Sequence, residues 1–199
     1  MTNLRPTPYD GHMGSESTRA TGVAPALLLS MPQLMDPNFH RAVVLLCEHT
    51  AEGAFGLIIN RPTETSASEA VQLMPPPDRD GGLNLWTGGP VEPQRGWILT
   101  GDEPHDIDSI AIASGVFLST SPLLLRRLIE TAPRRTRVLT GYAGWGPGQL
   151  DAELAASAWL IADIDPYLVF DVKATDMWEA AIRRLGADPG KLQMGQGVH

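Results

Sequence analysis

The sequence predicts one α/β or α+β domain built on a mixed β-sheet. Its 199 residues, 43% of them hydrophobic, can bury a sizeable core, and this length favours one domain over two. Short apolar runs typical of strands alternate with tight turns and with segments of helical spacing. Neither an internal repeat nor a change of composition divides the chain.

Residues 1–24 are rich in Pro, Gly, Ser and Thr and have little to bury. We expect them to form a disordered tail, and residues 25–199 to form the domain. The tail has no apolar run of signal-peptide length, and no later segment approaches the roughly 18 apolar residues of a membrane span. The single cysteine, Cys47, excludes an intramolecular disulfide. We therefore expect a cytoplasmic protein with no membrane partner.

Three strands are predicted before the first helix. Residues 26–30 form a short apolar run that Pro32 ends, because proline has no backbone donor. Residues 42–48 and 54–60 are rich in Val, Leu and Ile, and the short loop between them contains Gly53. Such a loop is the usual link between antiparallel neighbours, so these two strands are predicted to form a hairpin.

The middle of the chain predicts two helices and four strands. Residues 66–74 have helical spacing that three prolines, residues 75–77, forbid from continuing. Ser121-Pro122 is a good helix start, and that helix should run to about Thr131. The four strands are residues 83–87, 96–100, 109–113 and 116–119, of which the last two form a second hairpin.

Near the C-terminus, residues 138–140 suit a strand, and a glycine-rich loop and a helix with apolar spacing from Leu150 to Ile161 should follow. Residues 167–171 are predicted to form a strand, and residues 175–185 a helix. The loop carries four glycines and two large aromatic residues: Gly141, Tyr142, Gly144, Trp145, Gly146 and Gly148. Because glycine lets another backbone or a ligand come close, this stretch suggests a shaped surface.

The glycine-rich loop does not match the known phosphate-binding patterns. A P-loop needs a lysine and a hydroxyl to close the glycine run, whereas Gln149-Leu150 follow Gly148 here. Asp151 and Glu153 would lie in the first helical turn, where they would repel an anion. Nucleotide binding through this loop is therefore not expected.

A candidate binding surface combines glycines, aromatic rings and arginines from separate parts of the chain. They could offer a ring for stacking, a cation for an acidic group and backbone amides for hydrogen bonds. In the alternative interpretation, the two rings pack into the core and the arginines pair with carboxylates such as Asp36 or Glu48. The members are Arg61, Gly88, Gly89, Arg95, Tyr142, Trp145 and Gln149.

The sequence predicts no catalytic set, no metal site and no cofactor. Cys47 and His49 would share a strand face, but zinc needs three or four ligands, and the other histidines show no helpful spacing. Cys47 is better explained as a small core residue, and His49 as a polar residue at the strand end. No serine lies in a G-x-S-x-G elbow, and burial in an apolar strand would make the thiol unreactive. The balance is against an enzyme.

Charge disfavours nucleic acid as a partner. The net charge of −8 and pI near 5.0 would repel nucleic acid and anionic membranes at long range. A group of arginines suggests a local basic patch, but given the overall charge a solvated helix face and turn explain it better. These residues are Arg126, Arg127, Arg134, Arg135 and Arg137, with Arg183 and Arg184 later in the chain.

Several motifs, in order over about residues 26–186, resemble the YqgE/AlgH family of bacterial proteins. They are Met31-Pro32-x-Leu34-x-Asp36-Pro37-Asn38-Phe39, Cys47-Glu48-His49, Ile59-Asn60-Arg61-Pro62, Gly88-Gly89-Pro90-Val91, Arg95-Gly96 and Gly141-Tyr142-Ala143-Gly144-Trp145-x-Pro147-Gly148-Gln149-Leu150. The resemblance implies a single α+β domain whose bifurcated mixed sheet includes a small barrel-like portion surrounded by helices.

The resemblance implies little about function, although one branch of the family is labelled a transcriptional regulator of exopolysaccharide synthesis. The chain also departs from the family at Thr100, Leu123, Asp151 and Ser157, where relatives often have His, an acidic residue, Glu and Asn. An activity that needs those polar groups is in doubt here.

Three functional hypotheses follow. The first is a non-enzymatic binding or regulatory protein that recognises a protein partner or small ligand through the glycine-rich aromatic loop. The second is an enzyme or cofactor-binding protein that holds a small acidic ligand with Arg61, Arg95 and Tyr142. The third, ranked last, is a DNA-binding regulator. The sequence does not indicate an oligomeric state.

Overall fold

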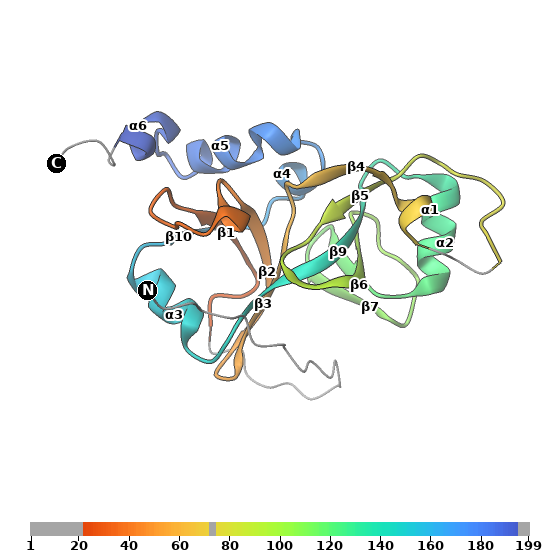
Figure 1. The fold of residues 1–199 in the computed structure, drawn as a ribbon, viewed down its shortest axis with the longest axis horizontal. Coiled ribbons are helices and arrows are strands. Elements are labelled where there is room, and N and C mark those ends of the chain that lie inside the picture. Colours follow the sequence, from red (N-terminus) through yellow and green to blue (C-terminus); the bar gives the residue numbers. More distant parts are fainter. Residues whose placement is uncertain (1–21, 72–74, 195–199) are drawn as a thin grey trace.

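A computed structural model of the chain describes residues 22–71 and 75–194 (Figure 1). These residues form one mixed α+β domain with a curled, mostly antiparallel half-barrel sheet and several helices, so the predicted fold class is confirmed. The tail expected over residues 1–24 lies almost wholly outside the described residues. No described helix has both the length and the apolar character needed to cross a membrane.

The described residues contribute ten strands. They are β1 (Ala26–Ser30), β2 (Val43–Thr50), β3 (Gly53–Ile58), β4 (Pro62–Ser66), β5 (Asn84–Thr87), β6 (Val91–Thr100), β7 (Ser109–Ala113), β8 (Val116–Ser119), β9 (Thr136–Trp145) and β10 (Trp159–Ala162). Their order is β10-β1-β2-β3-β9-β6-β8-β7. Both predicted hairpins, β2–β3 and β7–β8, are confirmed.

The long strand β9 is where the sheet divides. Its C-terminal half pairs with β3, placing Gly56 opposite Ala143. Its N-terminal half pairs with β6 on one side and with β5, in parallel, on the other, so that Ile98 and Leu85 both lie beside Val138. Since β4 pairs only with β5 among the described strands, β4 and β5 form the second branch.

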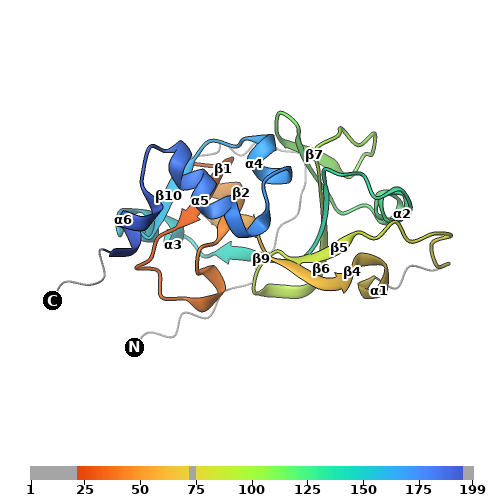
Figure 2. The same ribbon diagram turned by 90° about the horizontal axis from the view of Figure 1, so that it is seen from above.

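Six α-helices and one 3₁₀ turn cover the described part of the sheet: η1 (Pro37–Phe39), α1 (Ala67–Ala70), α2 (Pro122–Thr131), α3 (Gln149–Ala155), α4 (Pro166–Phe170), α5 (Ala174–Arg184) and α6 (Pro189–Met194). Figures 1 and 2 show α4, α5 and α6 beside the β1–β2–β10 end, with α1 and α2 at the other end. The predicted start of α2 is confirmed, because Ser121 Oγ accepts a hydrogen bond from the Leu124 amide at 3.2 Å.

Alternating residues of β1 and β2 feed two cores on opposite faces of the sheet. Leu27 and Leu45 face the larger core, which α5 closes with Met177 and Trp178. Leu28 faces the smaller core, together with the rings of two other tryptophans. The β1–β2 pair is therefore buried on both faces, which explains its nearly continuous apolar sequence.

Two predicted elements near the glycine-rich stretch are wrong. Residues 141–145 continue strand β9 instead of forming a loop. The helix predicted to reach Ile161 ends at Ala155, because Ser157 takes a left-handed backbone with φ 57°. Strand β10 follows and pairs with β1, so Ile161 lies opposite Leu28. The helical spacing beyond Ala155 was a coincidence that strand pairing overrides.

Residues 167–171, predicted as a strand, belong mostly to helix α4. Asp165 accepts a hydrogen bond from the Tyr167 amide at 2.8 Å, and Pro166 occupies the first turn. Helix α2 begins with the same signal, a capping side chain followed by proline, and there the signal predicts the start correctly. The apolar run, Tyr167 to Phe170, is too short for its period to distinguish a strand from a buried helix.

Other differences concern element length and elements that were not predicted. Helix α1 ends at Ala70, and the rest of its predicted range includes residues 72–74, which lie outside the described residues. Strand β4 and helix α6 were not predicted. Helix α5 matches its prediction to within one residue.

Candidate functional site

At the predicted surface around the glycine-rich stretch, two backbone segments cross in direct contact. The Gly88 amide donates to the Thr140 carbonyl, and the Gly88 carbonyl accepts from the Ile58 amide, both at 2.7 Å. A Cβ atom at Gly89 would overlap the backbone of Tyr142, and one at Gly141 would overlap the carbonyl oxygen of Gly89. These glycines are needed because two backbones pass in direct contact.

Both aromatic rings of that surface lie in the core. Tyr142 is 1% exposed, and its ring centre is 5.3 Å from that of Phe55. Trp145 is 5% exposed and stacks on Phe39 with ring centres 6.4 Å apart. Neither ring lines the cavity of about 510 Å³ beside helix α5 or the cavity of about 610 Å³ beside β6. The geometry favours the packing interpretation, because neither ring presents a face to a ligand.

Glu153, which the sequence reasoning did not single out as a binding residue, organises the residues around Trp145. Its carboxylate accepts hydrogen bonds from Trp145 Nε1 at 2.9 Å, Trp159 Nε1 at 2.7 Å and Gln149 Nε2 at 2.9 Å. Gln149 Oε1 in turn accepts the Gly146 amide at 3.1 Å. Two predicted site residues, Trp145 and Gln149, are thus brought together by an internal carboxylate.

The two predicted site arginines lie on separate elements. Arg61 Nη1 donates to the Asn60 carbonyl at 3.3 Å, and its Nη2 donates to the His40 carbonyl. Burial lowers the pKa of Arg61. Arg95 pairs with Glu92 at 3.3 Å and lies 4.7 Å from the ring centre of Trp97. Neither arginine pairs with Asp36 or Glu48 in the described structure.

The arginine group suggested as a basic patch is dispersed, and carboxylates pair with three of its seven members among the described residues. Arg135 pairs with Asp171 at 2.6 Å, Arg183 pairs with Glu179 at 2.7 Å, and Arg184 pairs with Asp165. Arg126 donates to the carbonyl groups of Pro75 and Pro76. Because carboxylates offset part of this charge, the described surface gives little support to phosphate binding.

Arg137 is buried in the sheet interior with only 4% of its surface exposed. Its guanidinium lies 4.1 Å from the ring centre of Trp86 and donates to the Ile59 carbonyl. No carboxylate pairs with it in the described part of the chain, and burial lowers the pKa of Arg137 to about 10. Removing this charge from water therefore costs free energy that no carboxylate offsets in the described part of the chain.

We expect Arg137→Met to leave the free energy of unfolding at pH 7 unchanged or to raise it by up to about 2 kcal/mol. The folded-state pKa, about 10, is below that of an arginine in the unfolded chain, so wild-type stability rises as pH increases above about 10. Urea unfolding at pH 7 and pH 11 should show the advantage of Met shrinking at the higher pH. A large loss of stability at pH 7 would show that the guanidinium contacts are net favourable.

Cys47 and His49 lie on opposite faces of β2, so the expected shared face is wrong. A β-bulge between Leu46 and Glu48 breaks the alternation at Cys47, which packs against the larger core. Burial raises the pKa of the Cys47 thiol. His49 Nδ1 accepts from the Val23 amide at 3.3 Å, and its Nε2 lies 3.4 Å from Asp151. The described residues contain no cluster able to hold a metal ion.

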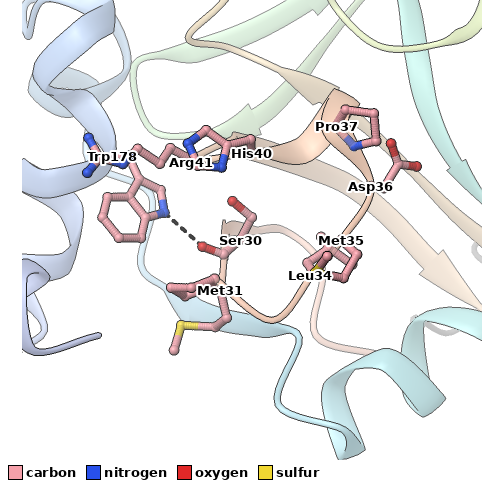
Figure 3. A pocket seen from close by; sticks show the side chains of 10 residues that line it. Ser30, Met31, Leu34, Met35, Asp36, Pro37, His40, Arg41 and Trp178 are labelled. Atoms are coloured by element: carbon pink, nitrogen blue, oxygen red, sulfur yellow. Dashed lines mark hydrogen bonds between the residues drawn. The ribbon is translucent and has the colours of Figure 1, made fainter. Parts of the chain in front are cut away.

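A pocket of about 510 Å³ lies between the segment of residues 30–41 and helix α5 (Figure 3). We call it the Trp178 pocket. Its volume falls within the range of small-molecule sites, roughly 300–1,000 Å³. It is lined by Ser30, Met31, Pro32, Leu34, Met35, Asp36, Pro37, His40, Arg41 and Trp178. None of the seven predicted site residues is among them.

Local hydrogen bonds shape the loop that lines the Trp178 pocket. The Met31 amide donates to the Ala158 carbonyl at 2.9 Å, and the Leu34 amide donates back to the Met31 carbonyl at 2.9 Å. Asp36 then accepts from the Asn38 amide at 2.9 Å and starts η1. On the opposite wall, Trp178 Nε1 donates to the Ser30 carbonyl at 2.9 Å.

Asn60 and Arg61, which belong to a second motif of the sequence, fix the end of this loop. Asn60 Nδ2 donates to the Arg41 carbonyl at 2.9 Å, and Asn60 Oδ1 accepts from the Val43 amide at 3.0 Å. Arg61 holds the neighbouring carbonyl of His40. Arg41 has φ 50°, a left-handed conformation that costs a non-glycine residue roughly 1–2 kcal/mol. Asn60 and Arg61 therefore hold Arg41 in a strained backbone at the rim of the pocket.

The pocket combines an apolar lining with charges at its ends. Met31, Leu34 and Met35 contribute apolar side chains to its lining, and Met35 is 84% exposed. Arg41 lies 5.5 Å from the ring centre of Trp178, at the end away from Asp36. Such a site can bind an apolar group and orient a charged one.

Comparison with known proteins identifies the family to which the sequence is similar. Residues 27–190 match the profile of the AlgH-like family. A "UPF0301 protein" of Myxococcus xanthus is 39% identical over 188 residues, which cover 89% of this chain and 98% of the relative. A counterpart from Xanthomonas campestris is 38% identical over 180 residues, 88% of this chain and 96% of its own length.

Solved structures agree with the fold. The solution structure of the AlgH protein from Pseudomonas aeruginosa has a TM-score of 0.72 and 33% identity, covering 93% of this chain and 100% of that chain. A crystal structure from Corynebacterium diphtheriae has a TM-score of 0.66 over 88% of this chain and 92% of that chain, and its 21% identity bears on the fold alone. With the family profile spanning most of the described domain, the chain belongs to the AlgH-like family.

Proposed function

We propose that the protein is a non-enzymatic binding or regulatory protein that recognises a protein partner or small ligand at the Trp178 pocket. This moves the proposed recognition surface away from the glycine-rich stretch. The single observation that supports it is an apolar side chain, Met35, held 84% exposed at a pocket of about 510 Å³. Exposed apolar surface at a concave site is typical of binding sites, and flexible methionine adapts to varied ligands.

The polar groups that line the pocket favour binding over chemistry. Ser30 is buried, and its Oγ already accepts a hydrogen bond from the Ala42 amide at 2.8 Å. The Asp36 carboxylate accepts from both the amide and the side chain of Asn38, at 2.9 and 3.0 Å. These groups hold the loop in shape, and they form no nucleophile–base pair among the described hydrogen bonds.

The proposal predicts that Met35→Asp abolishes ligand binding while leaving stability unchanged to within about 0.5 kcal/mol, since the side chain is exposed. A thermal-shift screen of metabolites, and affinity capture from a bacterial lysate followed by mass spectrometry, would identify ligands of the wild type. Met35→Asp should abolish the binding of each ligand or weaken it at least tenfold.

Leu123→Asp is the matched control, because Leu123 is also an exposed apolar residue but lies on α2 and does not line the pocket. It should retain every ligand of the wild type. Ligand profiles unchanged by Met35→Asp would reject the Trp178 pocket as the recognition site.

A further inference from the structure

We infer that the Trp178 pocket takes a small-molecule carboxylate with an apolar body, its carboxylate at Arg41 and its body against Met31 and Leu34 (Figure 3). This inference rests on the proposed binding function and adds the chemistry and orientation of the ligand. Three features support it: the placement of Arg41, the weakness of its internal ion pair, and the distribution of charge along the pocket.

Arg41 is positioned from both its backbone and its side chain. Asn60 holds its carbonyl in the left-handed segment, and its guanidinium lies over Trp178 at 5.5 Å from the ring centre. Trp178 is itself fixed by its bond to the Ser30 carbonyl. A guanidinium held beside an aromatic ring keeps its planar row of donors available for a carboxylate.

The internal partner of Arg41 is too weak to block a ligand. Glu179 is the only carboxylate paired with it among the described residues, at 3.6 Å, well beyond the roughly 2.7–2.9 Å of a charge-assisted hydrogen bond. Glu179 also pairs with Arg183 at the shorter distance of 2.7 Å. Since 42% of the Arg41 side chain is exposed, water and salt screen this pair and it contributes little to stability. A ligand carboxylate can therefore join or replace it.

The charges along the pocket give the ligand a direction. His40 and Arg41 lie next to each other on one rim, whereas Asp36 lies toward the other end in Figure 3. A carboxylate is attracted to the Arg41 end and repelled from the Asp36 end. The apolar residues Met31 and Leu34 line the space in between, so an apolar body fits there.

Decanoate, decan-1-ol and decylammonium test this inference, because they share one chain and differ in head group. Each is titrated into ¹⁵N-labelled protein while the indole Nε1–H signal of Trp178, assigned with Trp178→Phe, is followed. Decanoate should shift this signal and bind at least tenfold more tightly than decan-1-ol, a difference of about 1.4 kcal/mol. Decylammonium should bind more weakly than both.

Arg41→Asn should weaken decanoate at least tenfold without changing decan-1-ol, since asparagine tolerates the left-handed backbone. Arg95→Asn is the matched control, because Arg95 also stacks on a tryptophan and pairs with a glutamate, but lies outside the pocket. It should leave decanoate affinity unchanged.

The outcomes separate this inference from the proposed function. Equal affinity for decanoate and decan-1-ol, both lost in Met35→Asp, would overturn the carboxylate and keep the pocket. Tighter binding of decylammonium would assign the head group to Asp36 and also overturn the inference. Absence of decanoate binding would reject it, while the Met35→Asp ligand profiles would still decide the function.

Discussion

Gly141→Ala is expected to lower the free energy of unfolding by more than about 4 kcal/mol, a large fraction of the roughly 5–15 kcal/mol of a typical domain. The new Cβ would overlap the carbonyl oxygen of Gly89, and Gly141 has φ 71°, which alanine adopts only at a cost. This oxygen belongs to the backbone of the β5–β6 connection, which packs against β9, so it cannot rotate away as a side chain would. Urea unfolding followed by circular dichroism measures the loss.

Two other glycines separate crowding from backbone conformation. Gly148 has φ 70°, nearly the same as Gly141, but open space where a Cβ would go, so Gly148→Ala should cost only about 1–2 kcal/mol. Gly96 has open space and no left-handed strain, so Gly96→Ala should change stability by less than about 0.5 kcal/mol. Similar losses for Gly141→Ala and Gly148→Ala would show that the backbone crossing does not limit the fold.

Glu153→Ala is expected to lower the free energy of unfolding by about 3 kcal/mol. The substitution removes the acceptor of two nearly buried indole N–H groups, those of Trp145 and Trp159, and of the Gln149 amide. A charged acceptor makes stronger hydrogen bonds than a neutral one, and a donor left without a partner costs its full desolvation. Chemical unfolding gives the magnitude, and faster exchange of both indole N–H protons gives the cause.

Glu153→Gln and Asp151→Ala are the controls for this carboxylate. Glutamine keeps an acceptor oxygen and should lose only about 1 kcal/mol. Asp151, on the same helix, is a largely exposed carboxylate with one polar contact, to His49 Nε2 at 3.4 Å, so its removal should cost less than about 1 kcal/mol. If Glu153→Ala were no more damaging than Asp151→Ala, the tryptophan–glutamate network would not be a source of stability.

Sequence patterns predicted the elements whose signals are local. The β2–β3 and β7–β8 hairpins and helix α2 are bounded by glycine turns or by a capping serine with proline, and each was found as expected. Helix α4 was missed because its short apolar run has no decisive period, although Asp165-Pro166 signals its start. Strand β10 was missed because its pairing with β1 is a long-range property.

The sequence did not point to the Trp178 pocket, for a physical reason. Ser30 and Trp178 meet although 148 residues separate them, and no local pattern announces that contact. The motif from Met31 to Phe39 was visible in the sequence as part of the family resemblance, but it was not included in the candidate binding surface. The glycine-rich stretch drew attention because glycine signals close approach, and the partner in that approach is the protein's own backbone.

Intermolecular nuclear Overhauser effects between decanoate and the protein test the central claim most directly, because they report which side chains touch the ligand. The predicted contacts run from the decanoate chain to the methyl groups of Met31 and Met35 and to the indole of Trp178. Contacts to the rings of Tyr142 or Trp145 instead would contradict the assignment of recognition to the Trp178 pocket.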